Sequence, residues 1–69
     1  MARIEIDYAA YGERCEFSGA TDEAAIASAQ TVLRGMDWDG AENITLSPVL
    51  NSDEIVNQDG DVVGVVLEY

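Results

Sequence analysis

The side chains that could do chemistry in this sequence are almost all carboxylates. Its 69 residues include fourteen aspartates and glutamates, three arginines and one cysteine, but no histidine and no lysine. General bases, Schiff-base amines and phosphate clamps are most often histidine or lysine, so the usual catalytic groups are missing. Carboxylate pairs such as Asp37 and Asp39 could transfer protons, but nothing in the sequence indicates a cleft around them. We therefore do not expect an enzyme.

The only thiol belongs to Cys15, at an inward position of an alternating segment. A cysteine nucleophile needs a neighbour that favours its thiolate, and no histidine is present to do so. We interpret Cys15 as a small, buried apolar side chain. A single cysteine cannot form an intrachain disulfide, which is typical of a reducing cytosol. Residues 1–5 begin no apolar run of the kind that a signal peptide or a spanning helix needs, so we expect a cytoplasmic protein without membrane contact.

Two acidic loops that end in glycine suggest a test for calcium binding. When Gly60 is aligned with the glycine of an EF-hand loop, Ile55 falls on the first ligand position and Val66 on the twelfth. Neither side chain offers an oxygen ligand. The same alignment at Gly40 fails as well, and no glycine-rich phosphate loop occurs. The sequence therefore predicts no metal site and no cofactor.

The net charge of −11 restricts the function more than any other property. Charge of one sign on a small domain produces a potential of several kT and opposes compaction by self-repulsion. It would also repel the phosphates of nucleic acid, which argues against direct nucleic-acid binding. Because 48% of the residues are hydrophobic, the chain is too apolar for a disordered acidic tail. We expect residues 1–69 to form a single compact domain.

The first eighteen residues have the pattern of a β-hairpin, with a turn at residues 9–12. Both arms alternate between apolar and charged side chains, as expected of half-buried strands. The side chains expected to point inward are Ile4, Ile6, Tyr8, Cys15 and Phe17. Those expected to point outward are Arg3, Glu5, Asp7, Arg14 and Glu16.

A helix is expected over about residues 22–34. Thr21 is a fitting N-cap, and the two acids that follow it interact favourably with the helix dipole. Arg34 lies in the last turn, and Gly35 suits the position after the helix. Apolar residues recur at spacings of three and four and form one stripe, which consists of Ala25, Ile26, Ala29, Val32, Leu33 and Met36.

A third strand is expected at residues 43–47, with Ile44 and Leu46 on one face and Pro48 at its end. The last two strands are expected at residues 55–57 and 61–69. They flank Asp59-Gly60, a strong signal for a two-residue hairpin turn. In this register Val56 pairs with Val63. The core face then contains Val63, Val65 and Leu67, and the opposite face contains Val62 and Val66.

These elements predict an α+β fold: an antiparallel sheet of four to five strands with one helix packed on one face, in the order ββαβββ. The expected core consists of Ile4, Ile6, Phe17, Ile26, Ala29, Leu33, Ile44, Leu46, Val63, Val65 and Leu67. If the last strand lies at a sheet edge, Val62 and Val66 would form a flat apolar strip. We expect a monomer, or a weak homodimer through that strip.

The acids are the candidate partner-binding residues, and they occur in every segment. Two residues apart on a strand, side chains lie about 6.7 Å from each other, a spacing suited to imitating successive backbone phosphates. The candidates are Glu5, Asp7, Glu13, Glu16, Asp22, Glu23, Asp37, Asp39, Glu42, Asp53, Glu54, Asp59 and Asp61. Scattered charge usually means only a solvated surface, but it usually mixes signs, and lysine is absent here.

Together these features resemble the acidic, DNA-mimicking anti-CRISPR proteins, small phage-encoded inhibitors of bacterial defence. The resemblance covers the size, the charge, the missing catalytic set and the order of elements, not a motif. It implies binding to the basic DNA-recognition surface of a CRISPR effector subunit, which would block the binding of target DNA. It also implies action in the cytoplasm of the host cell, if a phage encodes the chain.

Two other interpretations remain open. A cytosolic protein of a halophile can also be rich in acids and free of lysine, because carboxylates keep it dissolved. Alternatively, the chain is an acidic, antitoxin-like module that binds a basic protein. Folding at low ionic strength would separate the first interpretation from mimicry, and a co-purifying basic partner would identify the second.

Overall fold

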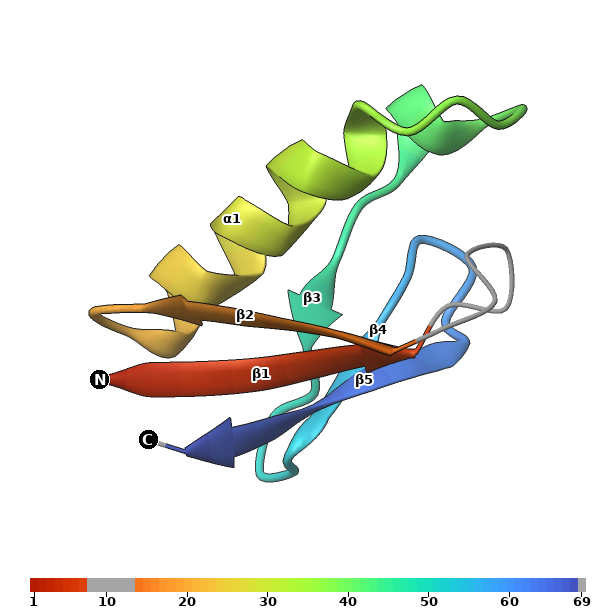
Figure 1. Cartoon of the computed structure of the whole chain (residues 1–69). Coiled ribbons are helices and arrows are strands. Elements are labelled where there is room, and N and C mark those ends of the chain that lie inside the picture. The colour runs from red at the N-terminus through yellow and green to blue at the C-terminus, as the bar shows by residue number, and fades with distance from the viewer. Residues whose placement is uncertain (8–13, 69) are drawn as a thin grey trace.

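A computed structural model of the chain shows a five-stranded antiparallel sheet with α1 packed against one face (Figure 1). The structure describes residues 1–7 and 14–68. In chain order the elements are β1 (Ala2–Asp7), β2 (Arg14–Gly19), α1 (Asp22–Arg34), the 3-10 helix η2 (Ala41–Asn43), β3 (Ser47–Pro48), β4 (Glu54–Val56) and β5 (Val62–Glu68). The order in the sheet is β2-β1-β5-β4-β3, so the first and last strands lie side by side. The predicted α+β fold is confirmed.

β1 and β2 pair as the alternation predicts. Ile4 lies opposite Phe17, and Ile6 lies opposite Cys15. Ile4 and Ile6 are fully buried, and Phe17 is partly buried against the core. The predicted turn between the strands falls within residues 8–13, outside the described part of the chain.

α1 begins and ends at the predicted residues. The Oγ1 atom of Thr21 caps it by accepting a hydrogen bond from the backbone N–H of Ala24 at 3.1 Å. The buried face is narrower than the predicted stripe, because α1 packs mainly on β1 and β2. Val32 and Met36, at its margin, are 47% and 37% exposed. The buried residues of the helix are Ala25, Ile26, Ala29 and Leu33.

The segment after α1 is not the strand predicted over residues 43–47. Residues 41–43 form η2, and β3 contains only Ser47 and Pro48. Ile44 and Leu46 are nevertheless buried, as predicted for the core. The alternation of this segment therefore marks burial, not strand pairing.

Side chains take the place of a neighbouring strand along residues 44–46. Two of them come from α1 and one from the turn between β4 and β5. The backbone N–H of Leu46 donates to Gln30 Oε1 (2.9 Å), and the N–H of Thr45 donates to Gln58 Oε1 (3.1 Å). Arg34 Nε–H donates to the carbonyl oxygen of Ile44 (2.7 Å). They satisfy backbone groups that no strand reaches, and they tie the helix to the turn.

The faces of the last strand differ from the prediction. Val56 lies opposite Val62 instead of Val63, because the register shifts between residues 55 and 56. Residues 63 and 64 are both buried. After them, side chains predicted to face the core face outward, and those predicted to face outward face the core. Val63 is buried, as predicted, but Val65 and Leu67 are 37% and 41% exposed instead of lying in the core. Val66, which was predicted to face outward, packs against the core.

The turn between β4 and β5 contains the predicted Asp59-Gly60, and Gly60 has a φ of 84°. The connection is longer than two residues, since it covers residues 57–61. Asn57 shapes it, because its Oδ1 atom accepts hydrogen bonds from the N–H groups of Asp59 and Asp61, each at 3.0 Å. These bonds account for the burial of a polar side chain here.

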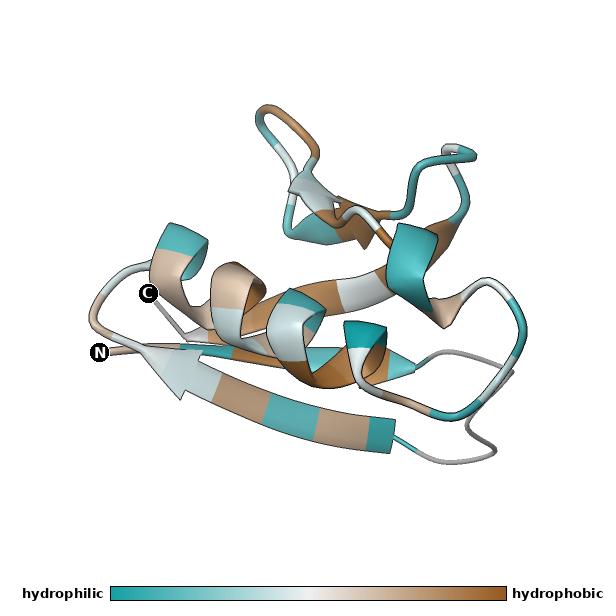
Figure 2. Cartoon of the chain, turned by 90° about the horizontal axis from the view of Figure 1, so that it is seen from above, coloured by the Kyte–Doolittle hydropathy of each residue, from teal (hydrophilic) through white to brown (hydrophobic). Residues whose placement is uncertain are grey.

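The core lies between α1 and the inner face of the sheet. Ile55, which is not among the predicted core residues, is fully buried at the centre of β4. Viewed from above, hydrophobic and hydrophilic positions alternate along β2 at the rim of the sheet (Figure 2). The buried cluster consists of Ile4, Ile6, Ala25, Ile26, Ala29, Leu33, Ile44, Leu46, Ile55 and Val63.

The homodimer predicted through the last strand required that strand to lie at a sheet edge, and the structure does not meet this condition. β5 lies between β1 and β4, so it is not an edge strand. Val66 faces the core, and the strip that it was expected to form with Val62 does not exist.

Gly64 allows β5 to lie close against β1, and this closeness gives a prediction. A Cβ atom at Gly64 would lie 2.6 Å from the backbone carbonyl oxygen of Glu5 and 2.6 Å from Cδ1 of Ile6. We expect Gly64→Ala to lower the free energy of unfolding by about 1–3 kcal/mol, measured by urea denaturation, because the central strands must move apart. Gly35→Ala is the control, since its nearest neighbour would be 3.5 Å away. Equal stability of the two variants would contradict this packing.

Candidate partner-binding site

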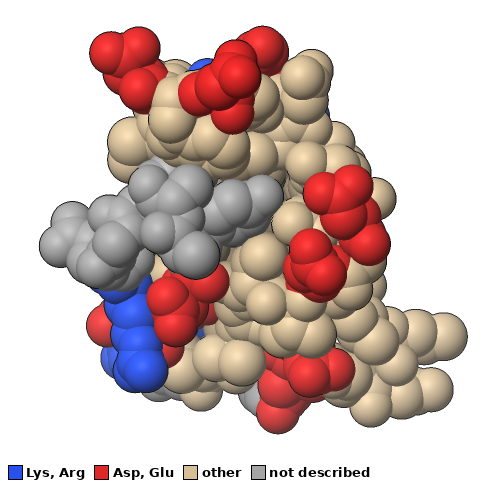
Figure 3. All heavy atoms as spheres, turned by 90° about the vertical axis from the view of Figure 1, so that its right-hand side faces the viewer, with Lys and Arg blue, Asp and Glu red and all other residues tan. Residues whose placement is uncertain are grey.

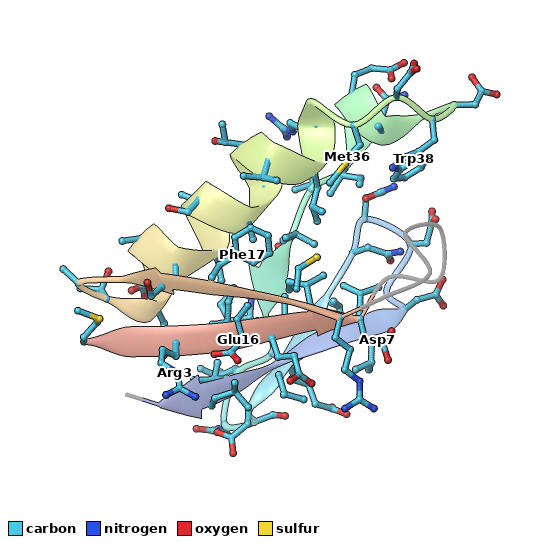
Figure 4. All side chains as sticks on the ribbon, in the orientation of Figure 1. Arg3, Asp7, Glu16, Phe17, Met36 and Trp38 are labelled. Carbon is cyan, nitrogen blue, oxygen red and sulfur yellow. The ribbon has the colours of Figure 1, made fainter. Side chains whose placement is uncertain are left out.

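The outer face of β1 and β2 contains the first group of predicted site residues. Glu5, Asp7 and Glu16 do point away from α1, but each lies beside an arginine. Arg3 Nε is 3.2 Å from Glu16 Oε1, and Arg14 lies 3.7 Å from a carboxylate oxygen of both Glu5 and Asp7. Figure 4 shows Arg3, Asp7 and Glu16 below the sheet, on the side opposite α1. Three carboxylates and two guanidinium groups leave this face close to neutral.

The register explains why the two arginines are needed. Glu5 lies directly opposite Glu16, and like charges in that position are destabilising. Arg14 lies opposite Asp7 and diagonal to Glu5. Alternation along the sequence predicts that all these side chains point outward, but it does not predict which of them pair. Knowing the register of the hairpin would have been enough to find the pairs.

Arg14 gives a second prediction. We expect Arg14→Ala to lower the free energy of unfolding by about 0.2–1 kcal/mol, because the repulsion between Glu5 and Glu16 is then less compensated. The loss should shrink in 1 M salt, which screens exposed charges. Thermal unfolding at both salt concentrations measures it. A second substitution, Glu5→Gln, should recover part of the loss, and a double variant that simply adds two losses would contradict the coupling.

Asp22 and Glu23 occupy the first turn of α1, as predicted. Their charges lie at the positive end of the helix dipole, next to the Thr21 cap. Asp22 is half-buried and Glu23 is exposed. These two acids therefore stabilise the helix as well as adding to the surface charge.

Five further acids gather at one end of the molecule, which we call the acidic end. Segment 36–43 and turn 57–61 both lie on the right-hand side of Figure 1. The hydrogen bond between Gln58 and Thr45 ties the turn to the segment that follows η2. Figure 3 faces this end and shows separate groups of carboxylates around an uncharged area. The acidic end consists of Asp37, Asp39, Glu42, Asp59 and Asp61, all of them exposed.

Trp38 anchors the middle of the acidic end. It lies between Asp37 and Asp39, and its half-buried ring packs against the core. In Figure 4 the ring points from the loop after α1 toward the β4–β5 turn. Ala41, in η2, is almost fully buried as well. The backbone next to the flanking carboxylates is therefore held in place by the packing of Trp38 and Ala41.

The other predicted acids lie apart from the acidic end. Asp53 precedes β4 and Glu54 is its first residue, whereas Asp59 and Asp61 follow the strand at its other end, so the four do not form one surface. The backbone N–H of Glu54 donates to Ser52 Oγ at 3.0 Å, which closes the turn there. Glu13 lies outside the described residues.

Most of the described candidates form no ion pair with another described residue. Arg34, the third arginine, donates to the backbone of residue 44 instead of pairing with an acid. The carboxylates without an ion pair in residues 1–7 and 14–68 are Asp22, Glu23, Asp37, Asp39, Glu42, Asp53, Glu54, Asp59 and Asp61. Their charge is available to a binding partner.

Two other kinds of site are absent from the described part of the chain. No group of three or more cysteine, aspartate or glutamate side chains there is arranged to hold a metal ion. No helix there is long and apolar enough to cross a membrane. The exposed carboxylates remain the candidate site.

Comparison with known proteins adds no relative. No protein-family model matches the chain, and no curated protein or solved structure matches it either.

Proposed function

We propose that this chain is an acidic mimic of DNA that binds the basic, DNA-recognising surface of a bacterial defence complex and blocks it. The observation that carries the proposal is the set of nine described carboxylates without an ion pair, five of which form the acidic end. Such a set provides a negative surface for a positive groove. The role is binding, not catalysis.

The acidic end suits this role better than the outer face of β1 and β2. On that face Arg3 and Arg14 already neutralise most of the carboxylate charge. At the acidic end, Asp37 and Asp39 are two residues apart in sequence, as are Asp59 and Asp61. A rigid array of negative groups can bind without first losing much conformational entropy.

The resemblance to acidic anti-CRISPR proteins suggests the partner. A CRISPR effector holds its nucleic acid in a positively charged channel and contacts mainly the backbone. A protein that offers carboxylates in place of phosphates would occupy the same channel. Its affinity should fall with added salt, as expected of contacts between opposite charges at a surface.

Neutralising the acidic end tests the proposal. The partner is first captured from the natural host, and its affinity is measured for a triple variant, Asp37→Asn, Asp39→Asn and Glu42→Gln. We expect a loss of between about threefold and a hundredfold, because each exposed charge contributes about 0.2–1 kcal/mol. The control is Glu5→Gln, Asp7→Asn and Glu16→Gln, which removes the same charge from the paired face and should have a smaller effect. If the first variant binds as tightly as the parent, the acidic end is not the contact.

A further inference from the structure

The two edges of the sheet differ in how they are protected. β3 is only two residues long and ends in Pro48, which has no N–H to donate, so this edge is poorly suited to pairing. β2, at the other edge, is six residues long and contains no proline. Its outer side therefore presents backbone groups that no described strand pairs. An open edge of this length is a template for another strand.

The part of α1 that lies beside the β2 edge carries no acidic side chain. Residues 24–36 contain no aspartate or glutamate, although the chain has fourteen. Gln30 and Arg34 face residues 44–46, which lead to β3. The opposite flank of α1, with Ser28 and Val32, therefore lies on the β2 side. A negative partner meets little repulsion there, and a basic partner would find little to attract it.

We propose that β2 pairs antiparallel with β2 of a second copy, so that one sheet continues across a homodimer. The register follows from the charges. Centred on Glu16, the strands would place Glu16 against Glu16 of the partner subunit, which is unfavourable. Centred on Phe17, they overlap over residues 15–19 and place Glu16 opposite Ser18 of the partner subunit. The partly buried ring of Phe17 then meets its own copy on the helix side of the sheet.

The helices fit the same arrangement. Paired strands lie about 4.8 Å apart. Because α1 packs on both β1 and β2, it would lie about one strand spacing from the symmetry axis between the two β2 strands. The two helices would then lie about 10 Å apart, which is the usual packing distance. Gly19, at the end of β2, lies against Ala24 of α1. Counted from that contact, with rises of about 1.5 Å per helical residue and 3.3 Å per strand residue, Ser28 lies about level with Phe17. Ser28 would then lie near the symmetry axis. Val32, which is 47% exposed, would face Ala24 of the partner subunit.

Salt separates this dimer from the binding proposed above. Two copies repel each other through their net charges, so dimerisation should strengthen as salt screens them. Binding to a basic partner should weaken under the same change. The homodimer does not depend on the proposed function, and either proposal can fail alone.

Sedimentation velocity at 0.1 M and 1 M NaCl, over a range of protein concentrations, tests the dimer. We expect the parent to dimerise more tightly in high salt. Val32→Glu should raise the dimer Kd at least tenfold by placing a charge between the helices. Ser18→Glu should also raise the dimer Kd, because the new carboxylate faces Glu16 of the partner subunit. Arg3 lies opposite residue 18 within the same subunit and compensates the added charge, so the monomer should stay folded.

Thr31→Glu is the matched control, since it adds the same charge to the exposed side of α1, away from the sheet. It should dimerise like the parent. A parent that stays monomeric at about 1 mM protein in 1 M salt would overturn the proposal. Equal effects of all three substitutions would also overturn it, and a dimer indifferent to Ser18→Glu would contradict the strand pairing.

Discussion

The repulsion among its own carboxylates is the constraint that shapes this protein. A net charge of −11 on 69 residues opposes compaction, and only a small core opposes the repulsion. The structure responds by keeping acids apart. Ile4, Ile6, Leu33, Ile44 and Ile55 are buried with no described acidic side chain among the buried residues, and α1 has no acid after its first turn. Where two glutamates must lie opposite each other, two arginines lie beside them.

The same hydrogen bonds that complete the fold also hold the acidic end. Gln30 and Arg34 attach residues 44–46 to α1, and Gln58 attaches them to the β4–β5 turn. Trp38 packs the loop after α1 against the core. The carboxylates of the acidic end, which form no ion pair with another described residue, thus lie on backbone that packing and hydrogen bonds hold in place. This is the link from the packing of the chain to its proposed function.

Sequence patterns predicted the elements whose signals are local. Thr21 and the stripe gave the correct bounds of α1, and alternation gave the inward and outward faces of β1 and β2. The faces of β5 were wrong, because an irregularity opposite Val56 leaves no mark in the sequence. The acids were found as candidates, but their grouping was not. Whether a carboxylate meets an arginine, as Asp7 does, depends on contacts that appear only in the folded chain.

The central claim is that the carboxylates take the place of DNA phosphates, and a competition titration tests it most directly. The captured partner is loaded with labelled DNA, and the chain is added at several DNA concentrations while bound label is followed by fluorescence anisotropy. Mimicry predicts mutually exclusive binding, so the concentration of the chain needed to release half of the label should rise in proportion to the DNA. A ternary complex that retains the DNA while the chain is bound would contradict the account.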